Sequence, residues 1–285
     1  MSSPTGTLFI VATPIGNVDD ISVRARTVLS AVAVVAAEDT RHTGRLLDRL
    51  GIKASLLSCH EHNEAERVPQ LIARLRAGED VALVSDAGTP LVSDPGFRLV
   101  SAVANEGLTV SPVPGCSAAM AALSIAGLPT DAVLFAGFLP SSQVRRGVRL
   151  QELSVRTETL VFYESVHRIS ATLTAMAESL GGDRHVVAAR ELTKLHETIY
   201  RGSVEDVLAQ ISTDSGGSKG EYTLVVGGAA EAPVTDTELD KVLKVLLSYL
   251  GVRQAADAAA KLLGVKKNAA YKRALILRES TDDKY

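Results

Sequence analysis

The sequence lacks the features that tie a protein to a membrane or to an oxidising compartment. Its longest apolar run, residues 31–37, is far shorter than the roughly 20 residues that cross a bilayer. No basic segment followed by an apolar stretch opens the chain, so we expect no signal peptide. The two cysteines, Cys59 and Cys116, lie far apart and form no C-x-x-C, which disfavours a disulfide framework and a cysteine zinc site. We therefore expect a cytoplasmic protein without a membrane span.

Two common phosphate-binding signatures are also missing. The chain contains no G-x-G-x-x-G, which disfavours a dinucleotide site of the Rossmann type. It contains no G-x-x-x-x-G-K-[ST] either, which excludes a P-loop NTPase. Any cofactor must therefore be held by loops of another kind.

The composition is that of a soluble globular protein with an uneven charge. Hydrophobic residues make up 46% and charged residues 22% of the 285 residues, a length natural for two domains and an appendage. The net charge is −3, yet residues 253–278 carry seven basic residues against one acid, Asp257, which makes that segment +6 and the rest −9. This asymmetry favours a local anion-binding surface, although a solvated helix face explains it almost as well.

Strand-like and helix-like segments alternate through the first 230 residues. Strands are predicted at residues 7–12, 33–36, 55–57, 81–85 and 108–112, and again at 133–136, 159–163, 185–190 and 222–227. Helices are predicted between them at residues 21–29, 43–50, 64–76, 97–105, 143–153, 170–180 and 204–211. This alternation predicts an α/β fold with a largely parallel sheet. We place a domain boundary near a Gly/Pro-containing stretch, giving domains at residues 1–122 and 123–230.

The chain changes character after a Gly/Ala/Pro linker at residues 227–233. Three helices are predicted at residues 239–250, 253–263 and 266–277, with breaks at Gly251 and Gly264. A short helix, a glycine turn and a second basic helix resemble a helix-turn-helix, so residues 236–285 are predicted to be a C-terminal helical domain. We favour a nucleic-acid-facing role for it over a structural cap, because its basic residues cluster on the last two helices.

Three Gly/Pro-rich loops directly follow predicted strands, at residues 13–20, 85–96 and 114–118. In open α/β sheets, ligands bind outside the carboxyl ends of the strands, where glycine lets backbone approach a ligand closely. The second loop contains two acids, Asp86 and Asp94, and no lysine or arginine occurs between Asp80 and Phe97. Carboxylates and backbone carbonyls suit a cationic, hydroxyl-rich ligand better than a phosphate, and S-adenosylmethionine has this character.

Several motifs together resemble the tetrapyrrole-methylase-like superfamily, and more narrowly its ribosomal branch, whose members methylate the 2′-hydroxyl of a cytidine in 16S ribosomal RNA. The motifs extend over essentially the whole chain: TPIGN from Thr13, AEDTR from Ala37, HEHN from His60, the loop SDAGTPLVSDPG from Ser85, PGCSA from Pro114, FYESVHR from Phe162 and GEYTLV from Gly220. The first loop departs from the glycine-rich, acidic loop of the tetrapyrrole branch. This difference, the segment AEDTR and the basic tail favour RNA as the acceptor.

The resemblance implies two α/β domains with S-adenosylmethionine in the cleft between them, a homodimer, and no metal. It implies 16S ribosomal RNA within the small ribosomal subunit as the partner. The residues expected to bind the donor are Pro14, Asp86, Ala87, Gly88, Leu91, Val92, Ser117, Ala118, Leu139, Glu221 and Tyr222. The residues expected to contact the RNA are His60, His62, His167, Arg168, Lys266, Lys267 and Arg273.

The catalytic group is expected to be Glu38, Asp39 and Arg41. The two acids follow a predicted buried strand, so their side chains should emerge at the rim of the cleft, where one of them could deprotonate the acceptor. The other interpretation is that they only cap the helix that begins near Thr40. Arg41 is expected either to hold an RNA phosphate or to pair with Asp39.

Other candidates for the general base are His60, His62, Glu164 and His167. The H-x-H pattern has no third ligand nearby, so a metal site is disfavoured there. Two other functions stay open: C-methylation of a tetrapyrrole, and nucleic-acid binding without catalysis.

Overall fold

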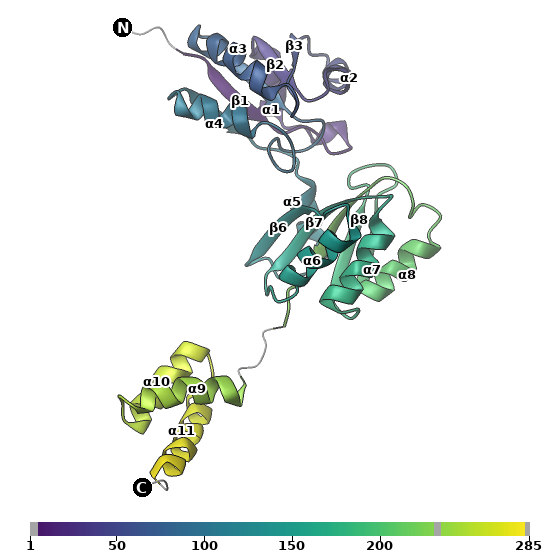
Figure 1. Cartoon of the computed structure of the whole chain (residues 1–285). Coiled ribbons are helices and arrows are strands. Elements are labelled where there is room, and N and C mark those ends of the chain that lie inside the picture. Colours follow the sequence, from purple (N-terminus) through teal and green to yellow (C-terminus); the bar gives the residue numbers. More distant parts are fainter. Residues whose placement is uncertain (1–4, 231–234, 283–285) are drawn as a thin grey trace. The chain divides into compact units, whose positions relative to one another are not determined.

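The computed structural model describes residues 5–230 and 235–282. The chain forms two compact units, Met1–Ala229 and Ala230–Tyr285 (Figure 1). The larger unit contains two five-stranded sheets, and the smaller unit is helical. No helix in the described ranges is long and apolar enough to cross a membrane.

The first sheet is entirely parallel, with strand order β3-β2-β4-β1-β5. Its strands are β1 (Thr7–Val11), β2 (Val34–Ala37), β3 (Leu56–Ser58), β4 (Val81–Val84) and β5 (Thr109–Val113). Its helices are α1 (Val23–Ala31), α2 (Thr40–Leu50), α3 (Glu64–Arg76) and α4 (Phe97–Asn105), with a short 3-10 turn at Val18–Asp20. Every residue of β2 and β4 is buried, as expected for parallel strands covered on both faces.

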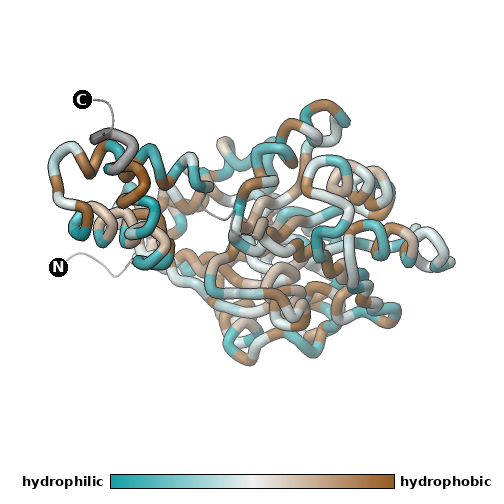
Figure 2. Tube along the Cα trace, turned by 90° about the horizontal axis from the view of Figure 1, so that it is seen from below, coloured by the Kyte–Doolittle hydropathy of each residue, from teal (hydrophilic) through white to brown (hydrophobic). Residues whose placement is uncertain are grey.

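Helices cover both faces of this sheet. Leu29 of α1 and Leu47 of α2 belong to one core cluster, and Leu75 of α3 and Leu99 of α4 belong to another. Hydrophobic and hydrophilic residues alternate along the helical turns in Figure 2, as in amphipathic helices with one buried face. This packing fixes the carboxyl ends of the parallel strands, from which the Gly/Pro-rich loops extend.

The second sheet is mixed and not largely parallel as predicted, with strand order β6-β7-β10-β8-β9. Only β6 and β7 pair in parallel, and the other pairs are antiparallel. Its strands are β6 (Val133–Phe138), β7 (Thr159–Ser165), β8 (His185–Arg190), β9 (Thr198–Ser203) and β10 (Glu221–Val226). Helices α6 (Gln143–Leu153), α7 (Ile169–Leu180) and α8 (Val204–Thr213) share one core cluster with this sheet.

The sequence prediction missed two elements, β9 and the helix α5 (Ala118–Ala126). The buried alanines of α5, with Leu123, form a separate core cluster with residues of β7, β8 and β10. The predicted boundary between residues 122 and 123 falls inside this helix. Because α5 packs against the second sheet, we propose that the second domain begins at α5.

The smaller unit contains α9 (Asp236–Leu247), α10 (Val252–Leu263) and α11 (Lys267–Asp282). A capping box between Thr235 and Glu238 begins α9, and Gly264 ends α10 with φ +67°. Its core consists of Leu239, Leu243 and buried alanines of α10 and α11. Small residues let the three helices approach closely, so this short segment has a core of its own.

Candidate functional site

A cavity of about 380 Å³ lies where the loops of the two sheets meet. It is within the size range of small-molecule sites. From the first sheet it is lined by Ile15, Glu38, Asp86, Ala87, Gly88, Thr89, Val92, Ser93 and Asp94, and by Ser117 and Ala118 at the start of α5. From the second sheet it is lined by Phe138, Tyr163, Glu164, Ser165, Ala189, Glu191, Leu192, Lys194, Glu221, Tyr222 and Thr223.

The loop at residues 85–96 has several residues with positive φ and is hydrogen-bonded to the first loop. Gly88, Leu91, Ser93 and Gly96 all have positive φ, an uncommon conformation for the two non-glycine residues. Thr13 and Gly88 exchange two backbone hydrogen bonds, of 2.8 and 3.0 Å, which join this loop to the first loop. The backbone of Gly88 is therefore fixed at the wall of the cavity, where a ligand can approach it.

Three carboxylates give this cavity a negative wall. Burial raises the pKa of Glu38, and the nearby carboxylates of Asp86 and Asp94 raise it further. Burial likewise raises the pKa of Asp94. Such a cluster is best satisfied by a cationic ligand, and the raised pKa makes Glu38 a better proton acceptor than an ordinary carboxylate.

Asp39 is adjacent to Glu38 in sequence but has a different role. It is the N-cap of α2, where its Oδ1 accepts from the backbone amides of Arg41 and His42 at 2.8 and 3.4 Å. Its carboxylate also pairs with the Arg41 guanidinium at 3.0 Å, and these contacts lower the pKa of Asp39 to about 2. The structure thus contains both the capping and the Arg41 pairing that the sequence allowed. Neither Asp39 nor Arg41 lines the cavity.

The cap predicts a pH-dependent contribution to stability. A lowered pKa means that the ionised carboxylate stabilises the fold above about pH 4 and that this stabilisation is lost as pH falls toward 2. We expect Asp39→Asn, which can still cap a helix, to melt slightly below the wild type at pH 6, with the difference shrinking below about pH 4 and vanishing near pH 2. Thermal melts across this range test it, and a difference independent of pH would contradict the role given to the charge.

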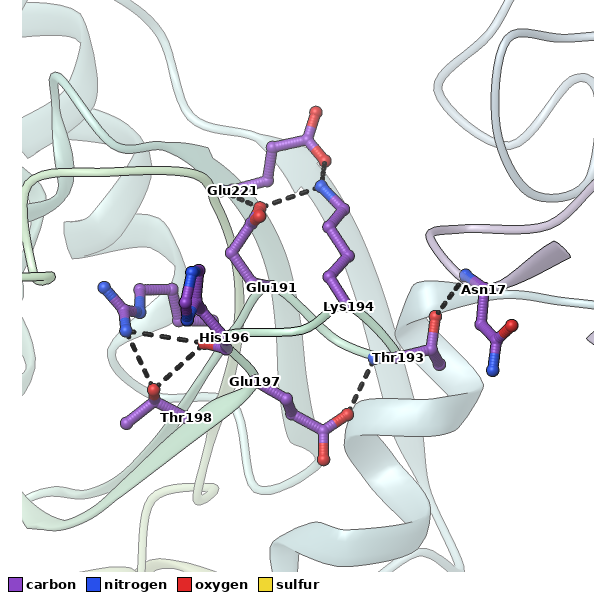
Figure 3. A network of polar contacts seen from close by, with 9 residues as sticks. Asn17, Glu191, Thr193, Lys194, His196, Glu197, Thr198 and Glu221 are labelled. Carbon is purple, nitrogen blue, oxygen red and sulfur yellow. Dashed lines mark hydrogen bonds and ion pairs between the residues drawn. The ribbon is translucent and has the colours of Figure 1, made fainter. Parts of the chain in front are cut away.

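The segment between β8 and β9, residues 191–197, reaches back to the first loop (Figure 3). The hydroxyl of Thr193 accepts from the backbone amide of Asn17 at 3.1 Å, while Lys194 Nζ bridges Glu191 and Glu221 at 2.8 and 2.9 Å. Burial opposes the charge on Lys194, but hydrogen bonds to both carboxylates raise its pKa. The ammonium is therefore held, charged, at the wall of the cavity.

A second cavity of about 480 Å³ adjoins the first. The two share Ile15, Asp86, Ala87, Lys194 and Glu221. The rest of its lining is Pro14, Gly16 and Val18 from the first loop and His42, Arg45, Leu46 and Arg49 from α2. The site is thus a pair of adjoining cavities. Acidic side chains outnumber basic ones in the first, and basic side chains outnumber acidic ones in the second.

Most residues predicted to bind a donor lie together. Asp86, Ala87, Gly88, Val92, Ser117, Ala118, Glu221 and Tyr222 line the first cavity, and Pro14 lines the second. Leu91 and Leu139 line neither: the Leu91 side chain packs against a core cluster of the first sheet, and Leu139 belongs to the core of the second.

Within the larger unit, the residues predicted to contact RNA do not line the two cavities. His60 and His62 make a ring contact at 6.0 Å but line neither cavity. Arg168 donates to the carbonyl oxygens of Leu139 and Pro140 and pairs with the buried Glu164, so its guanidinium holds the second domain together. His167 lines neither cavity.

Arg273 also has a structural partner. Its guanidinium forms a forked pair with Asp240 of α9, at 2.5 and 2.7 Å, which joins α11 to α9. Lys267 pairs with Asp257 at 2.6 Å near the surface, and Lys266 is exposed. The two N–H groups of Arg273 that would bind a phosphate are therefore already occupied by the Asp240 carboxylate.

The sequence reasoning did not single out several cavity residues. Thr89 and Ser93 lie within the loop it identified, where only Asp86 and Asp94 were noted for their charge. Tyr163 lies in the quoted motif FYESVHR but was given no role, and Phe138 reads as an ordinary strand residue. Lys194 lies in a segment that carried no motif, and only the fold brings it to the first loop. Among the described residues, no group of three or more His, Cys, Asp or Glu side chains is placed to hold a metal ion.

Comparisons with known proteins agree along the whole chain. The family model "Tetrapyrrole (Corrin/Porphyrin) Methylases" matches residues 7–208, and "RsmI C-terminal HTH domain" matches residues 233–278. A relative from Pseudomonas aeruginosa named ribosomal RNA small subunit methyltransferase I is 49% identical over 274 residues, covering 95% of this chain and 97% of the relative. One of the same name from Escherichia coli O157:H7 is 47% identical over 272 residues, covering 95% of each chain.

Solved structures share the fold at lower identity. Diphthine synthase superposes with a TM-score of 0.60 at 18% identity, covering 78% of this chain and 90% of the other. A uroporphyrin-III C-methyltransferase from Thermus thermophilus, in complex with S-adenosylhomocysteine, superposes with a TM-score of 0.55 at 19% identity, covering 78% and 97%. Two sheets packed with helices, with a cavity between their loops, thus define the fold of a methyltransferase. The chain belongs to the tetrapyrrole (corrin/porphyrin) methylase family, in the group that carries the RsmI C-terminal domain.

Proposed function

We propose that this protein methylates ribosomal RNA of the small ribosomal subunit, and that the methyl acceptor is the 2′-hydroxyl of a cytidine in 16S ribosomal RNA. The observation that carries the proposal is similarity at 47–49% identity, over 95% of the chain, to relatives named ribosomal RNA small subunit methyltransferase I. Fold alone would not choose the acceptor, since the solved neighbours include enzymes named for other substrates. The protein acts in the cytoplasm, where ribosomes are found.

S-adenosylmethionine is the methyl donor, and the first cavity fits it. The donor carries a sulfonium and an ammonium, which the carboxylates of Glu38, Asp86 and Asp94 complement. Phe138, Tyr163 and other apolar side chains provide surface for a flat base. The bound donor supplies an electrophilic methyl group, and the protein supplies binding, orientation and electrostatics.

The residues of this chain then act mainly by positioning. The shared wall of the two cavities, with Ala87 and Lys194, is where a ribose hydroxyl entering through the second cavity meets the first. Holding that hydroxyl in line with the methyl group is the largest contribution expected. Glu38 is placed to accept its proton, because it lines the first cavity with a raised pKa. Asp39 and Arg41 support it by starting α2.

The C-terminal unit is proposed to dock the RNA. Lys266, just before α11, and Lys272, within it, are exposed, and the side chain of Lys267 is 57% exposed. A surface of this kind contacts phosphates and releases counterions, so binding weakens as salt rises. Arg273 is left out of the test below because its pair with Asp240 serves the fold.

We expect the triple variant Lys266→Gln, Lys267→Gln, Lys272→Gln to weaken binding to small subunits. The slope of log affinity against log salt should flatten by up to about three units. The melting temperature should hardly change, because exposed pairs contribute little. Arg273→Gln serves as the contrast: it should lower the melting temperature by leaving Asp240 unpaired. An unchanged salt slope in the triple variant would make the unit a structural cap.

The proposed function is tested by incubating the protein with methyl-labelled S-adenosylmethionine and one of three acceptors. These are small subunits from a strain that lacks the modification, naked 16S ribosomal RNA, and uroporphyrinogen. We expect label in the ribosomal RNA and none in the tetrapyrrole. Transfer to the tetrapyrrole alone would make the protein a C-methyltransferase, and donor binding absent by calorimetry would leave a non-catalytic RNA-binding protein.

A homodimer is proposed from the family resemblance. Large apolar side chains such as Phe97, 74% exposed, and Val144, 76% exposed, support it, because a subunit interface would cover them. Sedimentation equilibrium at micromolar concentration distinguishes a dimer from a monomer.

A further inference from the structure

The second cavity has one wall made of cationic side chains. His42, Arg45 and Arg49 lie three and four residues apart on α2, so they share one face of that helix. At a rise of 1.5 Å per residue, the row extends for about 10 Å along the helix axis. All three side chains are exposed. The wall is thus a line of positive charge and not a single point.

These cations are not neutralised within the fold. In the described part of the chain, Arg45 donates only to the carbonyl oxygen of Arg41, at 3.3 Å, and no carboxylate pairs with Arg45 or Arg49. Arg41 on the same helix shows the contrast, because it is paired with Asp39. Asp48 belongs to α2 but does not line the cavity. Unpaired guanidinium groups beside a cavity are suited to an anionic ligand.

The two adjoining cavities differ in the sign of the charged side chains that line them. Acidic side chains outnumber basic ones in the lining of the first cavity. The row of bases lines the part of the second cavity that is not shared with the first, and the shared lining contains Asp86 and the Lys194–Glu221 pair. A cationic donor is therefore favoured at one end and an anionic acceptor at the other. An anionic acceptor in the second cavity therefore meets the row of cations on α2.

We propose that the second cavity is a binding site for the sugar–phosphate backbone of the acceptor strand, with Arg45 and Arg49 as the phosphate ligands and His42 beside them. This proposal rests on the proposed function and adds to it a site, separate from the C-terminal unit, that holds the strand next to the methyl donor. Guanidinium groups bind phosphate oxygens through two parallel hydrogen bonds, which fixes the strand as well as attracting it.

The test is the double variant Arg45→Gln/Arg49→Gln. Its affinity for small subunits is measured at several salt concentrations with S-adenosylhomocysteine present, and its affinity for the donor by calorimetry. The expected result is a slope of log affinity against log salt that is smaller by about 1.4–1.8 units, from two lost phosphate contacts. Donor affinity should stay at the wild-type value, because neither arginine lines the first cavity.

Two further variants make the result specific. Arg26→Gln/Arg98→Gln removes two exposed arginines that line neither cavity, and should leave the slope unchanged. Arg45→Lys/Arg49→Lys keeps the charge and should restore most of the slope but less of the methylation rate, since lysine cannot make the forked contact.

A wild-type slope in Arg45→Gln/Arg49→Gln, with the wild type methylating subunits normally, would overturn this proposal and leave the proposed function standing. If the wild type transferred methyl groups only to uroporphyrinogen, both would fail, and the arginines would face the acceptor's carboxylates.

Discussion

Replacing Gly88 by valine should abolish binding of S-adenosylmethionine while the protein stays folded. Gly88 has φ +79°, and a Cβ there would lie 3.5 Å from Cγ2 of Ile15 and 3.8 Å from the carbonyl oxygen of Cys116. The left-handed conformation costs a residue with a Cβ about 1–2 kcal/mol, and the two methyl groups of valine would occupy the cavity. We expect donor affinity, measured by calorimetry, to fall about 100-fold or more.

Gly107→Val is the matched control for this variant. Gly107 has φ +67°, so valine meets a similar backbone penalty, but nothing lies within 4 Å of its added Cβ. It follows α4 and lines neither cavity. The control should lose stability and keep donor affinity. Normal donor binding by Gly88→Val would mean that the loop at residues 85–96 does not hold the donor.

The second large effect is expected at Glu38. Glu38→Gln keeps the size and hydrogen-bonding capacity of the side chain but removes the base. Turnover should fall by about 10²–10⁴-fold, with donor affinity changed by no more than about threefold. Because burial and the neighbouring acids raise the pKa of Glu38, the wild-type rate should rise with pH through that raised value as the carboxyl loses its proton. The variant should lose this rise.

Asp39→Asn is the control for Glu38→Gln, because it makes the same chemical change one residue along at the helix cap. It should keep nearly full turnover. A loss confined to donor affinity in Glu38→Gln would move this residue into the donor site, and equal losses in both variants would point to a shared structural effect.

The sequence predicted most of the larger unit because its elements obey simple periodicities. Helix α3 at Glu64–Arg76 and strand β8 at His185–Arg190 have the predicted bounds. Helix α2 begins three residues earlier than predicted, at Thr40, because the carboxylate of Asp39 accepts from two backbone amides and fixes the first turn. Strand β9 was missed because the segment TIYRGS has polar residues at one end and stops in Gly and Ser.

The candidate site was predictable only in part. Loops after the strands of a parallel sheet meet at one edge, so the loops that contain Asp86, Gly88 and Ser117 could be grouped from their positions after strands. The donor-binding role of these residues came from the family resemblance. Lys194 could not be grouped with them, since it joins the site through the β8–β9 connection and the contact of Thr193 with Asn17. The hydrogen-bond partners of Arg168 and Arg273 could not be predicted either. The sequence does not show which carbonyl or carboxylate a basic side chain contacts in the fold.

The most direct test of the central claim is to map the methyl group on its product. Small subunits lacking the modification are methylated by the wild type with labelled S-adenosylmethionine, and their 16S ribosomal RNA is digested by alkali and by nuclease. A 2′-O-methyl group blocks cleavage at its own nucleotide, so we predict that the label appears in an alkali-resistant dinucleotide beginning with cytidine. Label released as a base-methylated nucleotide, or absent from the RNA, would contradict the account.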